Sequence, residues 1–217
     1  MQEKGRETMA YKVLLLNGSP HATGCTARAL QEVAGALNAE GVETEMIHFG
    51  KDNIGGCIAC GYCARNGKCV FNDKVNEVAA KFEEADGLII GSPVYYSSPN
   101  GTALSFMDRL FFSTGFSKQM KVGAAVVSCR RGGNTATFDA LNKYFTISGM
   151  PVVASTYWNQ VHGRKAEDVE KDLEGLQTMR NLGRNMAFLI KAIAAEKAKA
   201  GLPLEERDYF TSFPDGK

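Results

Sequence analysis

Short apolar runs alternate with segments of helical periodicity along most of this chain. The runs that predict strands are residues 12–16, 44–49, 87–91, 121–127 and 151–155. Four of them are apolar or small on both faces, as is typical of a parallel sheet covered on both sides. The second run is more polar, which suits a strand near an edge. The pattern therefore predicts a mostly parallel sheet.

Between these runs, apolar residues recur every three or four positions, as they do on one face of a helix. The stripes are Ala27, Leu30, Ala34 and Leu37; Val75, Val78 and Phe82; Leu104, Met107, Leu110 and Phe111; and Phe138, Leu141 and Phe145. A last stripe predicts one long helix over residues 166–197, and Asn72 or Asp73 is expected to cap the second helix. Alternating strands and helices predict one α/β domain with right-handed crossovers.

The same pattern divides the chain into three segments. We expect the domain to cover residues 11–200, after a flexible N-terminal extension over residues 1–10. Residues 201–217 form a C-terminal arm that carries Tyr209, Phe210 and Phe213. Because a free tail rarely carries three aromatic residues, we expect the arm to pack on the domain or on a neighbouring subunit.

Composition and charge exclude several classes of protein. The 217 residues carry a net charge of +1, which gives no electrostatic reason to bind nucleic acid or an anionic membrane. No apolar run approaches the roughly 20 residues that cross a bilayer, and the first residues lack the apolar core of a signal peptide. We therefore expect a cytoplasmic protein with no nucleic-acid or membrane partner.

The loop after the first predicted strand, residues 17–26, is rich in glycine and hydroxyl residues and has no carboxylate. Ligands of open α/β sheets lie beyond the carboxyl ends of the strands, and a helix N-terminus favours a phosphate. The glycine motifs of P-loop and dinucleotide sites are absent here. A phosphate monoester fits better, and the alternative is a plain turn with a helix cap.

Two further loops leave the same edge of the predicted sheet. Residues 95–101 are polar and aromatic, and residues 128–133 end in two glycines that allow close approach of the backbone. Together the three loops are suited to a flat ring with polar edges, and Arg130 or Arg131 would supply positive charge. The alternative is that the tyrosines pack locally and the arginines are solvated.

The segments LNGSPH, GCTA, GSPVYYSSPNGTALSFMDR, RRGGNTATFDALNKYF and YWNQVHG resemble the NADPH-dependent FMN reductase family, and more narrowly its iron–sulfur flavoproteins. The resemblance covers roughly residues 11–195. It implies a three-layer flavodoxin-like α/β fold, with a five-stranded parallel sheet of order 2-1-3-4-5 and helices on both faces. It also implies that FMN binds at the switch point of the sheet.

The resemblance assigns FMN contacts to these loops and to one histidine. The phosphate loop would contribute Ser19, His21, Gly24, Cys25 and Thr26. The loop along the isoalloxazine would contribute Pro93, Val94, Tyr95, Tyr96 and Ser97. The third loop would contribute Ser128, Arg130, Gly132 and Gly133, and His162 would lie beside the flavin or be structural. Many members have Arg and Asn where this chain has His21 and Cys25, so its phosphate donors differ.

Four of the six cysteines fall within thirteen residues with the spacing C-x2-C-x2-C-x5-C. They are Cys57, Cys60, Cys63 and Cys69. Without a signal peptide, such a group indicates metal or redox chemistry in a reducing compartment. The spacing resembles that of iron–sulfur flavoproteins, which implies a [4Fe–4S] cluster. A metal-free loop, a zinc site and a redox disulfide remain open as alternatives.

The resemblance implies an oxidoreductase that takes electrons from NAD(P)H through FMN and passes them to a flavin, a quinone or another small acceptor. No side chain is expected to act as nucleophile or general base, because the flavin carries the redox chemistry. One alternative is a non-enzymatic carrier that exchanges electrons with a ferredoxin-like protein, and another is a redox sensor. We expect a homodimer or homotetramer, because flavin sites in this family tend to lie at subunit boundaries.

Overall fold

The computed structural model describes residues 11–209 and residue 211. The expected N-terminal extension over residues 1–10, together with Phe210 and Phe213 of the expected arm, lies outside the described residues.

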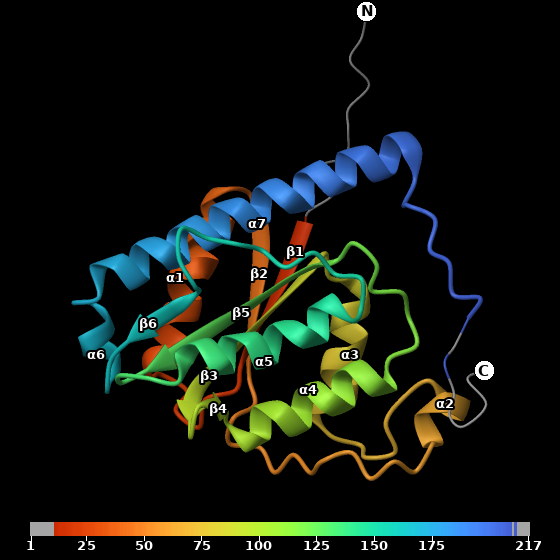
Figure 1. Ribbon diagram of the computed structural model, residues 1–217, viewed down its shortest axis with the longest axis horizontal. Helices are drawn as coiled ribbons and strands as arrows, with labels where there is room; N and C mark the ends of the chain where they lie inside the picture. Colours follow the sequence, from red (N-terminus) through yellow and green to blue (C-terminus); the bar gives the residue numbers. More distant parts are fainter. Residues whose placement is uncertain (1–10, 210, 212–217) are drawn as a thin grey trace, which may run out of the picture.

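Six strands form one sheet at the centre of the molecule (Figure 1). They are β1 (Tyr11–Asn17), β2 (Val42–His48), β3 (Gly87–Tyr95), β4 (Ser98–Pro99), β5 (Val122–Cys129) and β6 (Gln160–His162). Five of them are parallel in the order β2-β1-β3-β5-β6, and the two-residue β4 pairs antiparallel with β3. The parallel strands thus confirm the predicted order 2-1-3-4-5.

Helices cover both faces of this sheet (Figure 1). They are α1 (Cys25–Ala39), α2 (Tyr62–Asn66), α3 (Lys74–Glu84), α4 (Gly101–Ser113), α5 (Asn134–Thr146), α6 (Ala166–Val169) and α7 (Leu173–Ala200). Successive strand residues point to opposite faces, so Val13 and Leu15 pack with α1 and α7, whereas Leu14 and Leu16 pack with α3, α4 and α5. The apolar runs are therefore continuous because both faces of each strand are buried.

Side-chain caps begin two of the expected helices. Asp73 Oδ1 accepts a hydrogen bond from Val75 N at 3.1 Å, which confirms Asp73 as the cap of α3. Asn100 caps α4 in the same way, through Ala103 N at 3.2 Å. Each cap satisfies a backbone donor that the first helical turn leaves unpaired.

The fifth predicted strand, residues 151–155, is correct only in part. Gly123 N donates to Pro151 O and Val153 N donates to Gly123 O, both at 2.9 Å, around an isolated bridge at Val152. The regular pairing with β5 falls later, at Gln160–His162. The intervening chain turns toward α7, where Asn185 donates to Ala154 O and Ser155 Oγ donates to Thr178 O. The ladder is therefore interrupted after Val153, where residues 154 and 155 bond to α7 instead, and the local apolar pattern does not predict these bonds.

The last predicted helix, residues 166–197, is two helices. Asp172 interrupts it because its carboxylate accepts from Gly175 N at 2.9 Å and from His162 N at 2.7 Å, and so starts α7 afresh. A Cβ on Gly175 would lie 2.4 Å from Asp172 Oδ2. Glycine at this position therefore makes room for the cap.

Candidate flavin and cysteine sites

The loop between β1 and α1 leaves the N-terminus of α1 open. Gly24 is the N-cap residue, and no side chain caps the first turn in the described chain. The loop itself is fixed, because Ser19 N donates to Asn17 Oδ1 at 3.0 Å and His21 N donates to Ser19 Oγ at 3.1 Å. The free N–H groups and the positive end of the helix dipole suit an anion at this position.

The same loop rests closely on the segment after β2. His48 Nε2 lies 2.8 Å from Ser19 O, and a Cβ on Gly50 would stand 2.0 Å from that oxygen. No other residue leaves enough space for this contact. Gly50 thus helps to fix the shape of the phosphate loop, a role that the sequence did not reveal.

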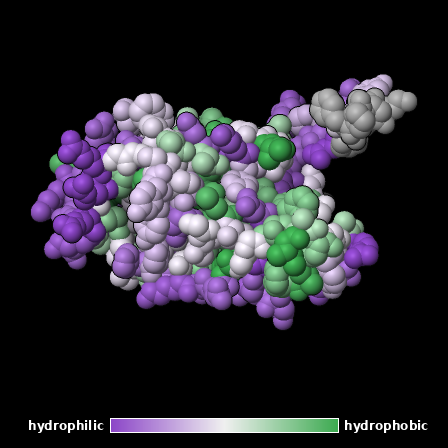
Figure 2. Space-filling model, turned by 60° about the horizontal axis from the view of Figure 1, so that its bottom comes forward, coloured by the Kyte–Doolittle hydropathy of each residue, from purple (hydrophilic) through white to green (hydrophobic). Residues whose placement is uncertain are grey.

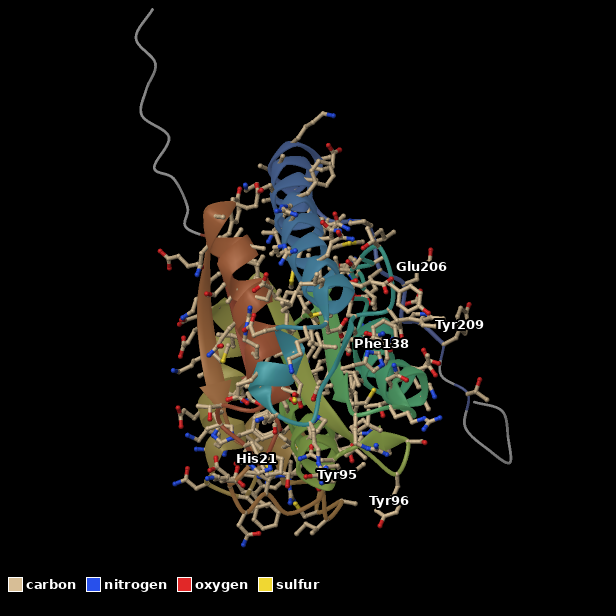
Figure 3. All side chains as sticks on the ribbon, turned by 90° about the vertical axis from the view of Figure 1, so that its left-hand side faces the viewer. His21, Tyr95, Tyr96, Phe138, Glu206 and Tyr209 are labelled. Carbon is tan, nitrogen blue, oxygen red and sulfur yellow. The ribbon has the colours of Figure 1, made fainter. Side chains whose placement is uncertain are left out.

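The end of β3 and the start of β4 form a tight hairpin. Val94 pairs with Pro99 and Tyr95 with Ser98, so Tyr96 and Ser97 are the two turn residues. Both have positive φ, 50° and 60°, as both central residues of a type I′ turn do. Positive φ costs a bulky residue about 1–2 kcal/mol. The turn directs the Tyr96 side chain into solvent, away from the body of the molecule (Figure 3).

The end of β5 meets the other two loops. Ser128 Oγ lies 2.8 Å from Thr26 Oγ1, which joins β5 to the first turn of α1. Gly133, with φ of 88°, lies so near the hairpin that a Cβ there would be 2.7 Å from Ser97 Oγ. The three predicted loops therefore converge in space, as their places at the strand ends imply.

A fourth segment, directly after β6, brings charge to the site. Gly163, Arg164 and Lys165 line the same pocket as the other three loops. The sequence analysis missed them, although they directly follow the segment YWNQVHG. Their position after this segment is the only feature of the sequence that could have indicated them. Arg164 and Lys165 bring two positive charges to the pocket, and Glu167, whose Oε2 lies 4.0 Å from Lys165 Nζ, brings one negative charge.

The convergence creates one pocket of about 470 Å³, a volume in the usual range for a small-molecule site. From the predicted residues it contains Ser19, His21, Gly24, Cys25, Thr26, Pro93, Val94, Tyr95, Ser128 and Arg130, and it adds Thr23, Cys129, Gly163, Arg164, Lys165, Ala166 and Glu167. Figure 3 shows His21 and Tyr95 at the same end of the molecule. We call this space the flavin pocket.

Five predicted residues do not line the flavin pocket: Tyr96, Ser97, Gly132, Gly133 and His162. His162 packs beside the cap of α7, with Nδ1 3.5 Å from Asp172 Oδ2, which favours its structural role. The pocket also holds two thiols, of Cys25 and Cys129. Burial is the main cause that raises the pKa of each above its ordinary value. Both thiols are therefore neutral near pH 7.

The four clustered cysteines line a second, apolar pocket beneath α4. Cys57, Cys60, Cys63 and Cys69 share it with Ile58, Val70, Phe71, Arg109 and Phe112, among others. We call it the cysteine pocket. Ile58, Val70, Phe71 and Phe112 are exposed, and Figure 2 shows hydrophobic side chains gathered on the face that carries this loop.

The thiols of this pocket do not converge on a point. Within residues 11–209, no three side chains of His, Cys, Asp or Glu stand close enough together to hold one metal ion. The six cysteines are all unpaired thiols. A [4Fe–4S] cluster takes four cysteine ligands, one to each iron, and therefore needs thiols spread around a shared space. The four thiols share the lining of one pocket and supply the donor set that such a cluster takes, namely four cysteines.

Among the helices that the structure describes, none is long and apolar enough to cross a membrane.

A parallel sheet of this order, with helices on both faces and a pocket at the carboxyl ends of its strands, defines the flavodoxin-like class. A solved flavodoxin from the domain Archaea superposes with a TM-score of 0.58 at 18% identity, covering 83% of this chain and 99% of the other. Within this class, the chain belongs to the NADPH-dependent FMN reductase family, whose model matches residues 11–164. It is a flavoprotein of a family that uses FMN and NADPH.

Two iron–sulfur flavoproteins are similar to this chain over most of its length. One from Methanocaldococcus jannaschii is 36% identical over 190 residues, covering 84% of this chain and 98% of that protein. Another, from Methanosarcina thermophila, is 27% identical over 192 residues, covering 87% of this chain and 100% of that protein. The match extends over nearly the full length of both relatives.

Proposed function

We propose that this protein is an oxidoreductase that binds FMN in the flavin pocket and passes electrons from NAD(P)H to a flavin, a quinone or another small acceptor. The observation that carries the proposal is the convergence of four segments, after β1, β3, β5 and β6, on one pocket at the carboxyl edge of the sheet. Bound FMN would accept a hydride and release electrons singly, chemistry that protein side chains lack.

The side chains around the flavin pocket bind and orient rather than react. The first turn of α1, with Ser19 and Thr26, would take the phosphate of FMN, and Arg164 and Lys165 would balance its charge of about −2. Tyr95 and Pro93 would lie along the ring. Arg130 would stand where a reduced, negatively charged ring is stabilised.

We further propose that the cysteine pocket holds a [4Fe–4S] cluster. Its support is the set of four free thiols around one pocket and the iron–sulfur flavoproteins among the relatives. A second function, an electron carrier that exchanges electrons with a ferredoxin-like protein, is favoured by the exposed apolar residues around this pocket. Small redox partners dock on such limited surfaces.

Titration of the cofactor-free chain with FMN tests the proposal. We expect saturable binding at one site per chain, seen as quenching of flavin fluorescence. Lys165→Gln should weaken binding about 10- to 150-fold, since a charge-assisted hydrogen bond contributes about 1.5–3 kcal/mol. The matched control is Lys171→Gln, an exposed lysine outside the pocket lining, which should bind like the wild type. A folded wild-type chain without FMN affinity would contradict the proposal.

Steady-state kinetics separates the two functions. Rapid NAD(P)H oxidation with a soluble quinone or free flavin supports the reductase. Turnover that appears only when a ferredoxin is added supports the carrier. Iron and acid-labile sulfide, measured on protein purified without oxygen, decide between a loaded cysteine pocket and a metal-free loop.

A further inference from the structure

Arg109 is an unusual residue for a helix that packs on a sheet. It lies in α4 and is 1% exposed, which makes it the largest fully buried side chain in the described chain. Arginine is almost never this deeply buried unless it is paired. We therefore looked for the groups that pair with the buried guanidinium of Arg109, next to the cysteine loop.

The guanidinium joins three separate segments of the chain. Nη1 and Nη2 donate to the two carboxylate oxygens of Asp73 at 2.7 and 2.9 Å, in a bidentate pair. Nη1 also donates to Gly55 O at 3.3 Å, just before the first cysteine of the loop. Nε donates to the sulfur of Cys69 at 3.3 Å. The ring of Phe71 covers the guanidinium at 4.8 Å.

Charge pairing alone does not account for this arrangement. Asp73 already balances the charge of Arg109 with two hydrogen bonds, and it also caps α3. The remaining Nε–H donor is directed at sulfur, which is a weak acceptor as a thiol and a much better one as a thiolate. The donor thus matches the deprotonated form that a metal-bound Cys69 would have.

The backbone of Cys69 is held from the other side. Cys69 N donates to Asn76 Oδ1 at 3.0 Å, and Asn76 Nδ2 donates to Cys69 O at 3.0 Å. Cys57 and Cys60, in contrast, are exposed on the loop. Cys69 is therefore the thiol whose backbone and sulfur are both fixed within the described residues of the loop.

We propose that Arg109 is the positioning residue of the cysteine pocket. It fixes Cys69 and the start of the loop in one arrangement, and it raises the reduction potential of a cluster bound there. Hydrogen bonds to cluster sulfurs set such potentials, and the Nε–H donor of Arg109 at Cys69 stabilises the more negative, reduced state. This inference rests on the proposed cluster and goes beyond it by assigning a role to a residue that is not a ligand.

Two variants separate the contributions of Arg109. Arg109→Lys keeps the charge but loses the planar fork that reaches Asp73, Gly55 and Cys69 together. Arg109→Gln loses the charge and keeps one short donor. Arg180→Gln, on α7, is the matched control, because Arg180 pairs with Glu32 and does not line the cysteine pocket.

The holoprotein, purified without oxygen, is measured in two ways. Loss of iron to a chelator should be about 10- to 100-fold faster in both Arg109 variants, as is usual when the support of a metal ligand is removed. The midpoint potential, from a redox titration followed by electron paramagnetic resonance, should shift to more negative values in Arg109→Gln and shift less in Arg109→Lys. Bound FMN per chain reports whether each variant folds.

The results distinguish the two levels of the proposal. Wild-type iron retention and potential in both variants would overturn the role of Arg109 while leaving the cluster in place. A wild-type protein that binds FMN but never holds iron and sulfide would overturn the cluster, and this inference with it. If Arg109→Gln fails to fold, Arg109→Lys alone decides through its iron retention.

Discussion

Neighbouring tyrosines in the flavin pocket and its hairpin have opposite surroundings. Tyr95 lines the flavin pocket, whereas Tyr96 is fully exposed and has a positive φ of 50°. The sequence assigned both to the ring of FMN, because adjacent residues of identical type give no basis for choosing between them. The type I′ turn makes the choice by sending one side chain into the site and the other into solvent.

Tyr95→Ala should therefore weaken FMN binding more than Tyr96→Ala. Loss of an aromatic contact costs about 0.5–1.5 kcal/mol beyond the buried area, or roughly 2- to 13-fold in Kd. Tyr96→Ala should leave Kd within about a factor of two. Fluorescence titration with FMN measures both, and equal losses in the two variants would show that Tyr96 also reaches the ring.

Tyr144, a partly buried residue, links two helices through its hydroxyl. It lies in α5, and its hydroxyl donates to Asp108 of α4. Burial, followed by this bond to a carboxylate, raises the pKa of Tyr144 far above its ordinary value. The phenol therefore stays protonated in the folded chain at pH values where the unfolded chain releases the proton.

This shift makes stability fall at high pH. Below about pH 10, the pKa of an unfolded tyrosine, both states hold the proton and the contribution of Tyr144 is complete. Above it, the unfolded chain loses the proton first, so the free energy of unfolding decreases as the pH rises. Urea unfolding at pH 8 and pH 10.5 should show a smaller decrease in Tyr144→Phe than in the wild type. An identical decrease would contradict the shift.

At the scale of elements, α1 and α7 approach each other at a glycine. A Cβ on Gly183 would lie 2.7 Å from Ala36 Cβ and 2.8 Å from Val33 O. The sequence shows only a glycine inside a helical stripe, where it normally weakens the helix by about 0.5–1 kcal/mol. The structure gives the reason for the glycine: α1 and α7 pack so closely there that a larger side chain would not fit.

Gly183→Ala should destabilise the protein, although alanine is the better helix former. Overpacking costs about 1–3 kcal/mol and outweighs the gain in propensity. Gly35→Ala is the matched control, since Gly35 lies inside α1 and a Cβ there would have no neighbouring atom within 4 Å. It should stabilise by about 0.5–1 kcal/mol. Urea unfolding of both variants checks the opposite signs, and a stabilising Gly183→Ala would refute the contact.

At the scale of the whole molecule, the described part of the C-terminal arm runs along the surface of the domain and leaves its large apolar side chains exposed. Gln119 Nε2 donates to Pro203 O at 2.9 Å, but the side chains of Leu204 and Tyr209 are 90% and 97% exposed. Figure 3 shows Glu206 and Tyr209 on the outside of the molecule. Large apolar side chains in this state are typical of a surface that another chain covers.

We propose that this arm contacts a second copy of the chain in a homodimer or homotetramer. Light scattering should give a mass that is a multiple of 23.5 kDa for the full chain. Truncation after Ala200 should shift the mass toward that of one chain, because the exposed arm is removed and the core elements stay. A full chain that behaves as a monomer would contradict the proposal.

The sequence by itself determined the alternation of strands and helices, the strand order through its family motifs, and ten of the residues that line the flavin pocket. These features depend on local pattern and on the rule that parallel strands end at one edge of the sheet. Local pattern placed the fifth strand only in part, because residues 154–155 form hydrogen bonds with α7, far along the chain, and the ladder resumes only at Gln160.

Tertiary structure alone decided the remaining features of the sites. Arg164 and Lys165 line the flavin pocket because β6 ends beside it. His162 does not line the pocket, because its backbone N–H donates to Asp172 beside the start of α7. Arg109 reaches Cys69 because α4 lies over a loop that begins 54 residues earlier in the chain, at Gly55. Contacts between distant segments are set by packing, and no periodicity within one segment records which distant partner will meet it.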